Sequence, residues 1–345
     1  MRRALAIMAI AAAALLAGFA GTVWWEVRRP PAQRRGEAAR VTVQRGEPFS
    51  LLAGRLERAG LVRRARPLVV YATLTGGDRA VQSGTYAFTI GERPVDILRR
   101  LAAGDVLRAL VTIPEGWTKW EIAGAFGAAA VDSAALLEAI HDPGLRERRR
   151  VEAESLEGYL FPDSYLVPWG ATPLDVVRQM LSRLDEVFDA ELVTRAAEVG
   201  MTPHEVLTLA SIVEAEASIG EERARVAAVY LNRLRRGMRL EADPTVAYAM
   251  GGYRGRLLFE DLALESPYNT YRRGGLPPGP ICSPGEAAIR AVLYPDSTSR
   301  DLYFVARGDG GHVFSETLRE HNDAVRRLRA LQREARRSGG GDARR

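Results

Sequence analysis

Two glutamates, Glu214 and Glu216, are the residues of this chain whose placement most suggests acid chemistry. They lie two positions apart in the segment A-S-I-V-E-A-E at 210–216, among apolar residues that recur at helical spacing from Val206 to Ala217. At about 100° per residue, Glu214 lies at the edge of the apolar stripe, whereas Glu216 points roughly 160° away from it. The two carboxylates are therefore not expected to share one site.

A carboxylic acid partly embedded in apolar surroundings can act as a proton donor near neutral pH. Loss of solvation disfavours its charged form and raises its pKa. Glu214 is the better candidate for this role, because it borders the apolar stripe. The alternative is an ordinary boundary glutamate that pairs with an arginine, for instance on the helix expected at Glu221–Arg236. Periodicity by itself favours this alternative.

The helix that carries both glutamates begins at a clear signal. Thr202 can act as a hydroxyl N-cap, Pro203 suits the first helical position, and Glu205 completes a capping box. Further along, Leu302–Ala306 and His312–Ser315 predict a β-hairpin. The second half of the chain is therefore expected to be a mixed helical domain that ends in a hairpin.

Two irregular stretches could line a cleft beside this helix. The stretch L-E-G-Y-L-F-P-D-S-Y at 156–165 combines aromatic rings with carboxylates, which suits sugar rings with apolar faces and hydroxylated rims. A buried loop that anchors the domain could produce the same pattern. The turn-rich stretch 266–281 is long for a structureless segment, and such segments are usually functional.

The N-terminus predicts a membrane anchor. Ala4 to Trp25 is a run of 22 residues in which Thr22 is the only polar side chain, about the length that crosses a bilayer. Arginines flank the run, and Trp24 and Trp25 resemble an interfacial anchor. A cleavable signal peptide is the alternative, but the run is long for one and no A-x-A site stands out. The flanking arginines do not settle the orientation.

Composition argues against several other classes of protein. The net charge is +5, yet basic and acidic residues are interspersed and Lys119 is the only lysine, so no nucleic-acid partner is expected. The single cysteine, Cys282, excludes an internal disulfide and a metal site built on cysteines. The four histidines show no metal-binding spacing. We therefore expect neither a metal nor an organic cofactor.

The N-terminal half predicts a small α+β module. A strand, a glycine turn and a helix begin at Val41–Gly46, and the same pattern recurs 70 residues later at Val111–Gly116. The V-T-V-x-x-G pattern with its helix resembles the LysM type of glycan-binding module. The alternative is a simple strand and helix joined by a tight turn.

Seven short motifs taken together resemble the YceG-like endolytic murein transglycosylases. Their order and spacing match from about Val41 to Val325, which makes the set specific although each motif is weak. The motifs are L-E-G-Y-L-F-P-D-S-Y at 156–165, A-S-I-V-E-A-E at 210–216, N-R-L at 232–234, D-P-T-V at 243–246, Y-N-T-Y at 268–271, G-L-P-P-G-P-I at 275–281 and G-G-H-V-F at 310–314.

The resemblance implies an inner-membrane protein with an N-terminal span, a LysM-like region and a catalytic domain that faces the cell wall. The implied domain order is a transmembrane anchor at 1–27, a linker at 28–40, a LysM-like α+β module at 41–127, a helical connector at 128–155, a catalytic transglycosylase domain at 156–330 and a disordered basic tail at 331–345.

The resemblance also implies a reaction. The family cuts nascent peptidoglycan strands between N-acetylmuramic acid and N-acetylglucosamine, leaves 1,6-anhydro-muramyl ends and thereby terminates strands. The glutamate after A-S-I-V is its catalytic residue, which here is Glu214; the family often has lysine next, where this chain has Ala215. A single acid suffices, because the muramyl 6-hydroxyl attacks within the substrate, whereas ordinary hydrolysis needs a second carboxylate.

Other site residues and partners are expected on the same basis. Cell-wall synthases are possible partners, and a muramidase or a non-catalytic glycan-binding scaffold are the alternative functions. The Y-N-T-Y residues could orient the muramyl acetamido group or only shape their loop, and His312 could line the cleft or only satisfy the hairpin. The expected substrate-binding residues are Glu157, Asp163, Asp243, Tyr268, Asn269, Tyr271 and His312.

Overall fold

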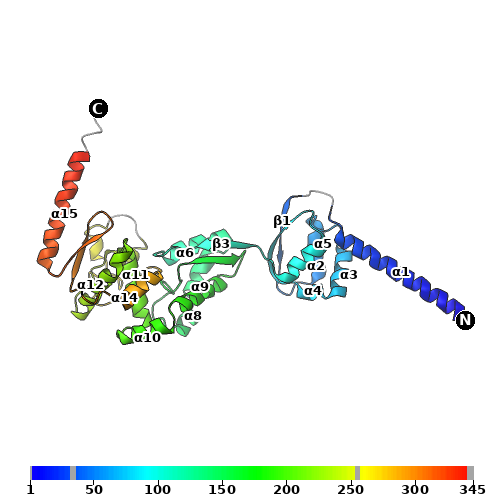
Figure 1. Cartoon of the computed structure of the whole chain (residues 1–345), viewed down its shortest axis with the longest axis horizontal. Helices are drawn as coiled ribbons and strands as arrows, with labels where there is room; N and C mark the ends of the chain where they lie inside the picture. Colours follow the sequence, from blue (N-terminus) through cyan, green and yellow to red (C-terminus); the bar gives the residue numbers. More distant parts are fainter. Residues whose placement is uncertain (1, 32–35, 253–256, 340–345) are drawn as a thin grey trace, which may run out of the picture. The chain divides into compact units, whose positions relative to one another are not determined.

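The computed structural model describes residues 2–31, 36–252 and 257–339. The chain forms two compact units, each of which is described by itself (Figure 1). Unit 1 comprises Met1–Leu110 with the short segments Ala128–Val131 and Leu166–Ala171. Unit 2 comprises Val111–Gly127, Asp132–Tyr165 and Thr172–Arg345.

Unit 1 begins with the candidate membrane helix α1 (Arg2–Arg28), which is long and apolar enough to cross a bilayer, with a mean hydropathy of 2.2. The last turn of α1 is part of the core of unit 1, because Val27 is only 1% exposed. The expected linker at 28–40 is therefore shorter than predicted. Residues 32–35 of it lie outside the described part, and Gly36 already donates a backbone hydrogen bond to Ile90.

The core of unit 1 lies between a two-stranded sheet and a group of helices. Strand β1 (Ala38–Val43) pairs antiparallel with β2 (Gly84–Thr89), with Val41 opposite Tyr86. The alternating pattern of β1 turns Val41 and Val43 into the core. The helices of this unit are α2 (Phe49–Arg58), α3 (Ala65–Thr75), α4 (Gly77–Ala80) and α5 (Pro94–Ala103).

The boundary between the units differs from the predicted module at 41–127. The repeated strand and helix correspond to β3 (Arg108–Thr112) and α6 (Lys119–Ala125), and the division at Leu110 assigns α6 to unit 2. Strand β3 pairs with β4 (Ser164–Pro168) in a two-stranded sheet of its own, and the division between the units passes through both strands. The two copies of the repeated strand and helix pattern therefore do not belong to one module. The predicted connector contains α7 (Ser133–Ile140) and α8 (Pro143–Arg148).

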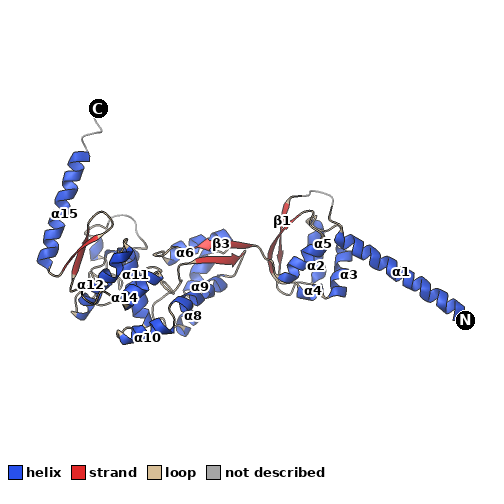
Figure 2. Ribbon diagram, viewed as in Figure 1, coloured by secondary structure: helices blue, strands red, loops and turns tan. Residues whose placement is uncertain are grey.

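Unit 2 is mostly helical and is built around α11 (Pro203–Glu216) (Figure 2). Every residue from Val206 to Val213 is buried, so this helix is covered on all sides. Helices α13 and α14 both pack against it. The other long elements here are α9 (Pro173–Val187), α10 (Ala190–Glu198), α12 (Arg223–Arg235), α13 (Asp243–Ala249) and α14 (Glu286–Leu293), with short 3-10 turns η1 (Phe126–Ala129), η2 (Gly220–Glu222) and η3 (Asp261–Ala263).

The C-terminal hairpin forms as predicted. Strand β5 (Tyr303–Ala306) pairs antiparallel with β6 (His312–Ser315), and helix α15 (Leu318–Gly339) follows. The tail expected to be disordered from 331 is helical as far as Gly339, because it continues α15. Residues 340–345 of that predicted tail lie outside the described part of the chain.

Candidate active site

Helix α11 presents two glutamates in its last turn. The predicted capping box is present at its start: the Thr202 amide donates to Glu205 Oε2 at 2.8 Å, and the Glu205 amide donates to Thr202 Oγ1 at 3.2 Å. The helix ends at Glu216, next to the Ala217 cap. The buried helix thus brings Glu214 and Glu216 to the edge of the core, on different faces.

Both carboxylate oxygens of Glu214 are bound. Arg223 Nη2 donates to Oε1 at 3.0 Å, and the backbone amide of Gly285 donates to Oε2 at 3.1 Å. The side chain is only 7% exposed. Arg223 is the first residue of α12. Glu214 thus pairs with an arginine of the next helix, as the alternative interpretation of its sequence position expected. Glu214 therefore ties α11 to α12 and to the start of α14.

A second carboxylate lies beside this ion pair. Arg223 Nη2 is 3.8 Å from Glu115 Oε2. Burial and the nearby negative charge of Glu214 raise the pKa of Glu115. Glu115 also fills the space over Gly285, because a Cβ added there would lie 1.9 Å from Glu115 Oε1. One arginine thus lies within ion-pair distance of two carboxylates.

Glu216 has a different environment. Its Oε1 accepts a hydrogen bond of 3.0 Å from the Tyr230 hydroxyl, a neutral donor. Burial raises the pKa of Glu216 to about 7, helped by the negative charge of Asp243 and opposed by the bond from Tyr230. Glu216 is consequently a carboxyl group whose pKa lies near neutral pH, so that its protonated and ionised forms are both populated there.

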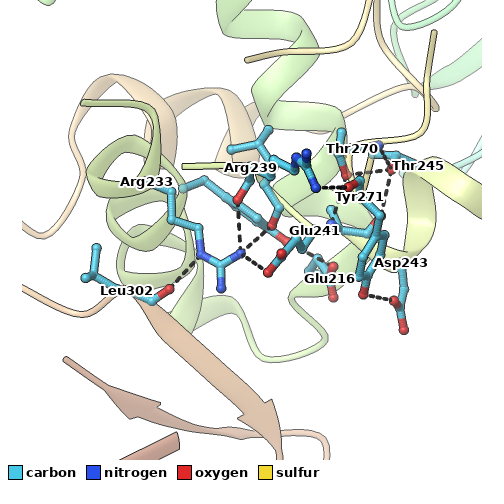
Figure 3. Close-up of polar contacts among 12 residues, drawn as sticks. Glu216, Arg233, Arg239, Glu241, Asp243, Thr245, Thr270, Tyr271 and Leu302 are labelled. Carbon is cyan, nitrogen blue, oxygen red and sulfur yellow. Dashed lines mark hydrogen bonds and ion pairs between the residues drawn. The ribbon is translucent and has the colours of Figure 1, made fainter. Parts of the chain in front are cut away.

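Asp243 and Tyr271 lie beside Glu216. The Tyr271 hydroxyl donates to Asp243 Oδ1 at 2.6 Å, and Figure 3 shows Glu216 next to this pair. Asp243 is exposed and is the first residue of α13, whereas Tyr271 comes from the turn-rich stretch 266–281. The structure thus brings together an acid, a carboxylate and a phenol from three separate segments. Asp243 and Tyr271 are among the candidate site residues expected from the sequence, but Glu216 is not.

Asn269 holds the loop that carries Tyr271. It is completely buried, and its Nδ2 donates to the carbonyls of Leu262 and Leu264 at 3.0 and 2.8 Å. Its Oδ1 accepts from the Tyr271 amide at 3.0 Å. Because the side-chain amide is already used by the backbone, Asn269 is placed to shape the loop, the alternative weighed for this residue.

Arg233 on α12 is a structural residue that the sequence pattern did not single out. Its Nε donates to the Leu302 carbonyl at 2.7 Å, and its Nη1 donates to the Leu240 carbonyl at 2.8 Å and to Glu241 Oε2 at 3.2 Å (Figure 3). The side chain is 9% exposed. Arg233 therefore joins the C-terminal hairpin to the segment that leads into α13. The motif N-R-L at 232–234, which contains Arg233, is the sequence feature that could have indicated its importance.

Glu157 lies beneath the surface instead of lining it. It is 2% exposed, its two oxygens accept from the Lys119 amide at 2.9 and 3.2 Å, and the Tyr248 hydroxyl also donates to it. Burial raises the pKa of Glu157 to about 7. Tyr268, from the Y-N-T-Y motif, packs against Tyr248 with a ring distance of 4.9 Å. Glu157 thus supports an aromatic cluster.

Asp163 and His312 are bound to other side chains. Asp163 Oδ2 accepts from Arg183 Nε at 2.6 Å, and bonds from the Ser164 amide and Arg183 hold the pKa of Asp163 below its usual range. His312 is 8% exposed, and its Nδ1 lies 2.7 Å from Glu222 Oε2. His312 therefore fixes the hairpin to the turn before α12, the alternative weighed for this residue.

A glutamate with a pKa near neutral pH beside a carboxylate is a candidate site for acid catalysis of glycosidic-bond cleavage. The sequence model of the YceG-like family matches residues 41–327. The chain belongs to the YceG-like family.

Characterised relatives cover most of the chain. An endolytic murein transglycosylase of Bacillus subtilis is 31% identical over 304 residues, which is 82% of this chain and 83% of the relative. The protein of that name from Streptococcus pneumoniae D39 is 31% identical over 315 residues, 82% of this chain but 57% of the longer relative. A crystal structure of a YceG-like protein from Listeria monocytogenes matches with a TM-score of 0.59 and 30% identity, over 84% of this chain and 99% of that one.

Proposed function

We propose that this protein is an endolytic murein transglycosylase, a lyase that cuts peptidoglycan strands between N-acetylmuramic acid and N-acetylglucosamine. The names of its relatives and its membership of the family support the activity. The observation in the structure that carries the proposal is Glu216, a carboxyl group with a pKa of about 7 beside Asp243 and Tyr271. The products are 1,6-anhydro-muramyl ends, and the cut terminates a growing strand.

The reaction requires one group that first donates and then accepts a proton. In the proposed mechanism, Glu216 protonates the oxygen of the leaving sugar while the glycosidic bond breaks. The resulting carboxylate then accepts the proton of the muramyl 6-hydroxyl, whose oxygen bonds to the anomeric carbon and closes the anhydro ring. No second carboxylate is needed to activate water, because the nucleophile belongs to the substrate.

We propose Glu216 as the acid, and Glu214, to which the family resemblance points, is the alternative that the test below separates from it. Both carboxylate oxygens of Glu214 are occupied, one by Arg223 and the other by the Gly285 amide. The single neutral hydrogen bond of Glu216 leaves it able to hold a proton. In this proposal Glu214 positions the end of α11.

Asp243 and Tyr271 are proposed to act on the sugar ring. The Tyr271 hydroxyl fixes the Asp243 carboxylate at an exposed position, where its negative charge can stabilise the positive charge that develops at the anomeric carbon. Tyr268 is proposed as a further substrate-binding residue. Glu157, Asp163, Asn269 and His312 are proposed to support the site, since each is bound to other parts of the protein.

The remaining parts of the proposal concern location. Helix α1 would anchor the protein in the inner membrane, with unit 2 on the side of the cell wall. The antiparallel pairing of β1 with β2, with helices α2, α3 and α4 between them in the chain, supports a LysM-like, glycan-binding unit 1. Cell-wall synthases stay a predicted class of partner.

The test is mass spectrometry of purified glycan strands digested by the full chain in detergent. We expect anhydro-muramyl ends from the unmutated protein, none from Glu216→Gln, and unchanged amounts from the control Glu286→Gln, an exposed glutamate that forms an ion pair with Arg290. Residual activity is expected for folded Glu214→Gln.

Each other outcome rejects a defined part of the proposal. Full activity in Glu216→Gln together with loss in folded Glu214→Gln would return the acid to Glu214. Reducing ends in place of anhydro ends would identify a hydrolase, with Asp243 as the next carboxylate to replace. Absence of cleavage by the unmutated chain would favour a glycan-binding scaffold.

A further inference from the structure

Three aromatic side chains from separate segments of unit 2 form one continuous surface. Trp120 lies on α6, Tyr248 on α13 and Tyr268 in the turn-rich stretch. The ring centroids of Trp120 and Tyr248 are 5.5 Å apart, and those of Tyr248 and Tyr268 are 4.9 Å apart. Trp120 is 39% exposed, an unusual exposure for the largest side chain. The three rings are in contact, and one of them faces solvent.

This surface is held from beneath by a buried carboxyl group. The Tyr248 hydroxyl donates to Glu157, which in turn accepts from the amide of Lys119, the residue before Trp120. Lys119 Nζ also lies 5.0 Å from the centre of the Trp120 ring. The central and outer rings are thus fixed to the same buried group. A fixed aromatic surface loses little entropy when it binds a ligand.

The elements that carry the rings also carry the proposed catalytic groups. Tyr248 is five residues beyond Asp243 on α13, about 7.5 Å along the helix and about 140° around it, so the two side chains leave different sides of the helix. Tyr268 precedes Tyr271 by three residues in the same loop. Tyr268 is therefore the ring that connects the aromatic surface to the Asp243 and Tyr271 pair.

We propose that Trp120, Tyr248 and Tyr268 form a subsite that stacks on a sugar ring of the bound glycan strand. This inference rests on the proposed function and extends it to a sugar outside the pair that is cut. The C–H face of an N-acetylated sugar is apolar and matches a ring face. Because the Tyr248 hydroxyl is already bound to Glu157, the subsite acts through ring faces. Glu157 is a positioning residue for it.

The test measures binding without cleavage. The full chain in detergent, carrying Glu216→Gln, is titrated calorimetrically with a hexamer of β-1,4-linked N-acetylglucosamine. Adding Trp120→Gln is expected to weaken binding about tenfold, the loss of one aromatic contact, whereas Trp120→Phe should retain most of the affinity. Tyr294→Ala is the control, since Tyr294 is 45% exposed and lies away from the cluster, beside Arg195. It should bind as tightly as its parent.

A second pair of variants separates ring stacking from hydrogen bonding. Tyr268→Phe keeps the ring and should bind normally, whereas Tyr268→Ala should bind more weakly. In the active chain, Trp120→Gln should raise KM on glycan strands and leave kcat unchanged, because the contact is made equally before and during the reaction. Melting temperatures establish that each variant is folded.

The outcomes distinguish this inference from the proposed function. Unchanged binding and KM in folded Trp120→Gln, or equal weakening by Tyr294→Ala, would overturn the subsite while leaving the activity intact. Failure of the unmutated chain to cut strands would overturn the proposed function. Weaker hexamer binding by Trp120→Gln in that case would still establish a glycan-binding surface.

Discussion

Glu214 and Glu216 are separated by one residue in the last turn of α11, yet they meet opposite kinds of partner. Glu214 is bound by the Arg223 guanidinium at 3.0 Å and by a backbone amide, whereas Glu216 is bound by the Tyr230 hydroxyl at 3.0 Å. Burial raises the pKa of Glu216, and the hydrogen bond from Tyr230 opposes this only in part. One helix turn therefore carries one glutamate held between a cation and a backbone amide and another held by a neutral hydroxyl.

The rate of cleavage should fall on the alkaline side of neutrality. The pKa of Glu216 is about 7, and the proposed acid must be protonated before the bond breaks. Well above this pH, kcat/KM should therefore drop about tenfold per pH unit. The measurement is initial rate of anhydro-end formation between pH 5 and 9. A rate that stays constant up to pH 9 would contradict the assignment.

Tyr230→Phe should move this alkaline limb to higher pH. The hydrogen bond from Tyr230 stabilises the Glu216 carboxylate and lowers its pKa, so removing the hydroxyl raises the pKa further. The same pH series on the variant checks the shift. Movement of the limb to lower pH would show that another group controls it.

Replacing Glu214 or Glu216 by glutamine should change the stability of the protein in opposite directions at pH 8. Because the pKa of Glu216 is raised, its ionisation in the folded protein lowers the free energy of unfolding as the pH rises from about 4.5 to 7. Glu216→Gln should therefore raise the free energy of unfolding by about 2 kcal/mol at pH 8 and change it little at pH 4. Glu214→Gln breaks a largely buried ion pair and should destabilise by about 1 to 3 kcal/mol. Thermal unfolding of the full chain at pH 4 and 8 measures both, and changes of equal sign at pH 8 would refute the contrast.

Replacement of Arg233 should loosen the C-terminal hairpin. Its guanidinium is 9% exposed and is bound to the Leu302 and Leu240 carbonyls, so Arg233→Ala should cost about 3 to 5 kcal/mol. The control is Arg235→Ala, an exposed residue two positions on, which should cost less than about 0.5 kcal/mol. Urea unfolding compares them, and similar losses would show that the buried contacts of Arg233 contribute little.

Gly158→Ala should be far more costly than the same change at Gly237. Both glycines have positive φ, +76° and +65°, so both substitutions carry a backbone cost of about 1 to 2 kcal/mol. At Gly158 the new Cβ would also lie 2.2 Å from Pro280 Cβ, whereas the space around Gly237 is open. We expect an added loss of about 2 kcal/mol at Gly158. Equal melting temperatures for the two variants would contradict this close approach.

Local structure could be predicted where it depends on neighbouring residues. The start of α11 follows from Thr202 and Glu205. The hairpin from β5 to β6 also matched, since capping and turn chemistry act over a few residues. The pairing of β3 with β4 could not be predicted, because the two strands are more than 50 residues apart in the chain.

The sequence by itself determined the family, the candidate membrane helix, the helix that carries the two glutamates and the motifs around it. The partners of the two glutamates follow only from the tertiary structure. Helical periodicity gives the direction of a side chain, but the pKa of a carboxyl group depends on the charges that other elements bring within a few ångströms. Arg223 comes from α12, and Asp243 from α13, so their effects on Glu214 and Glu216 arise only when the helices pack.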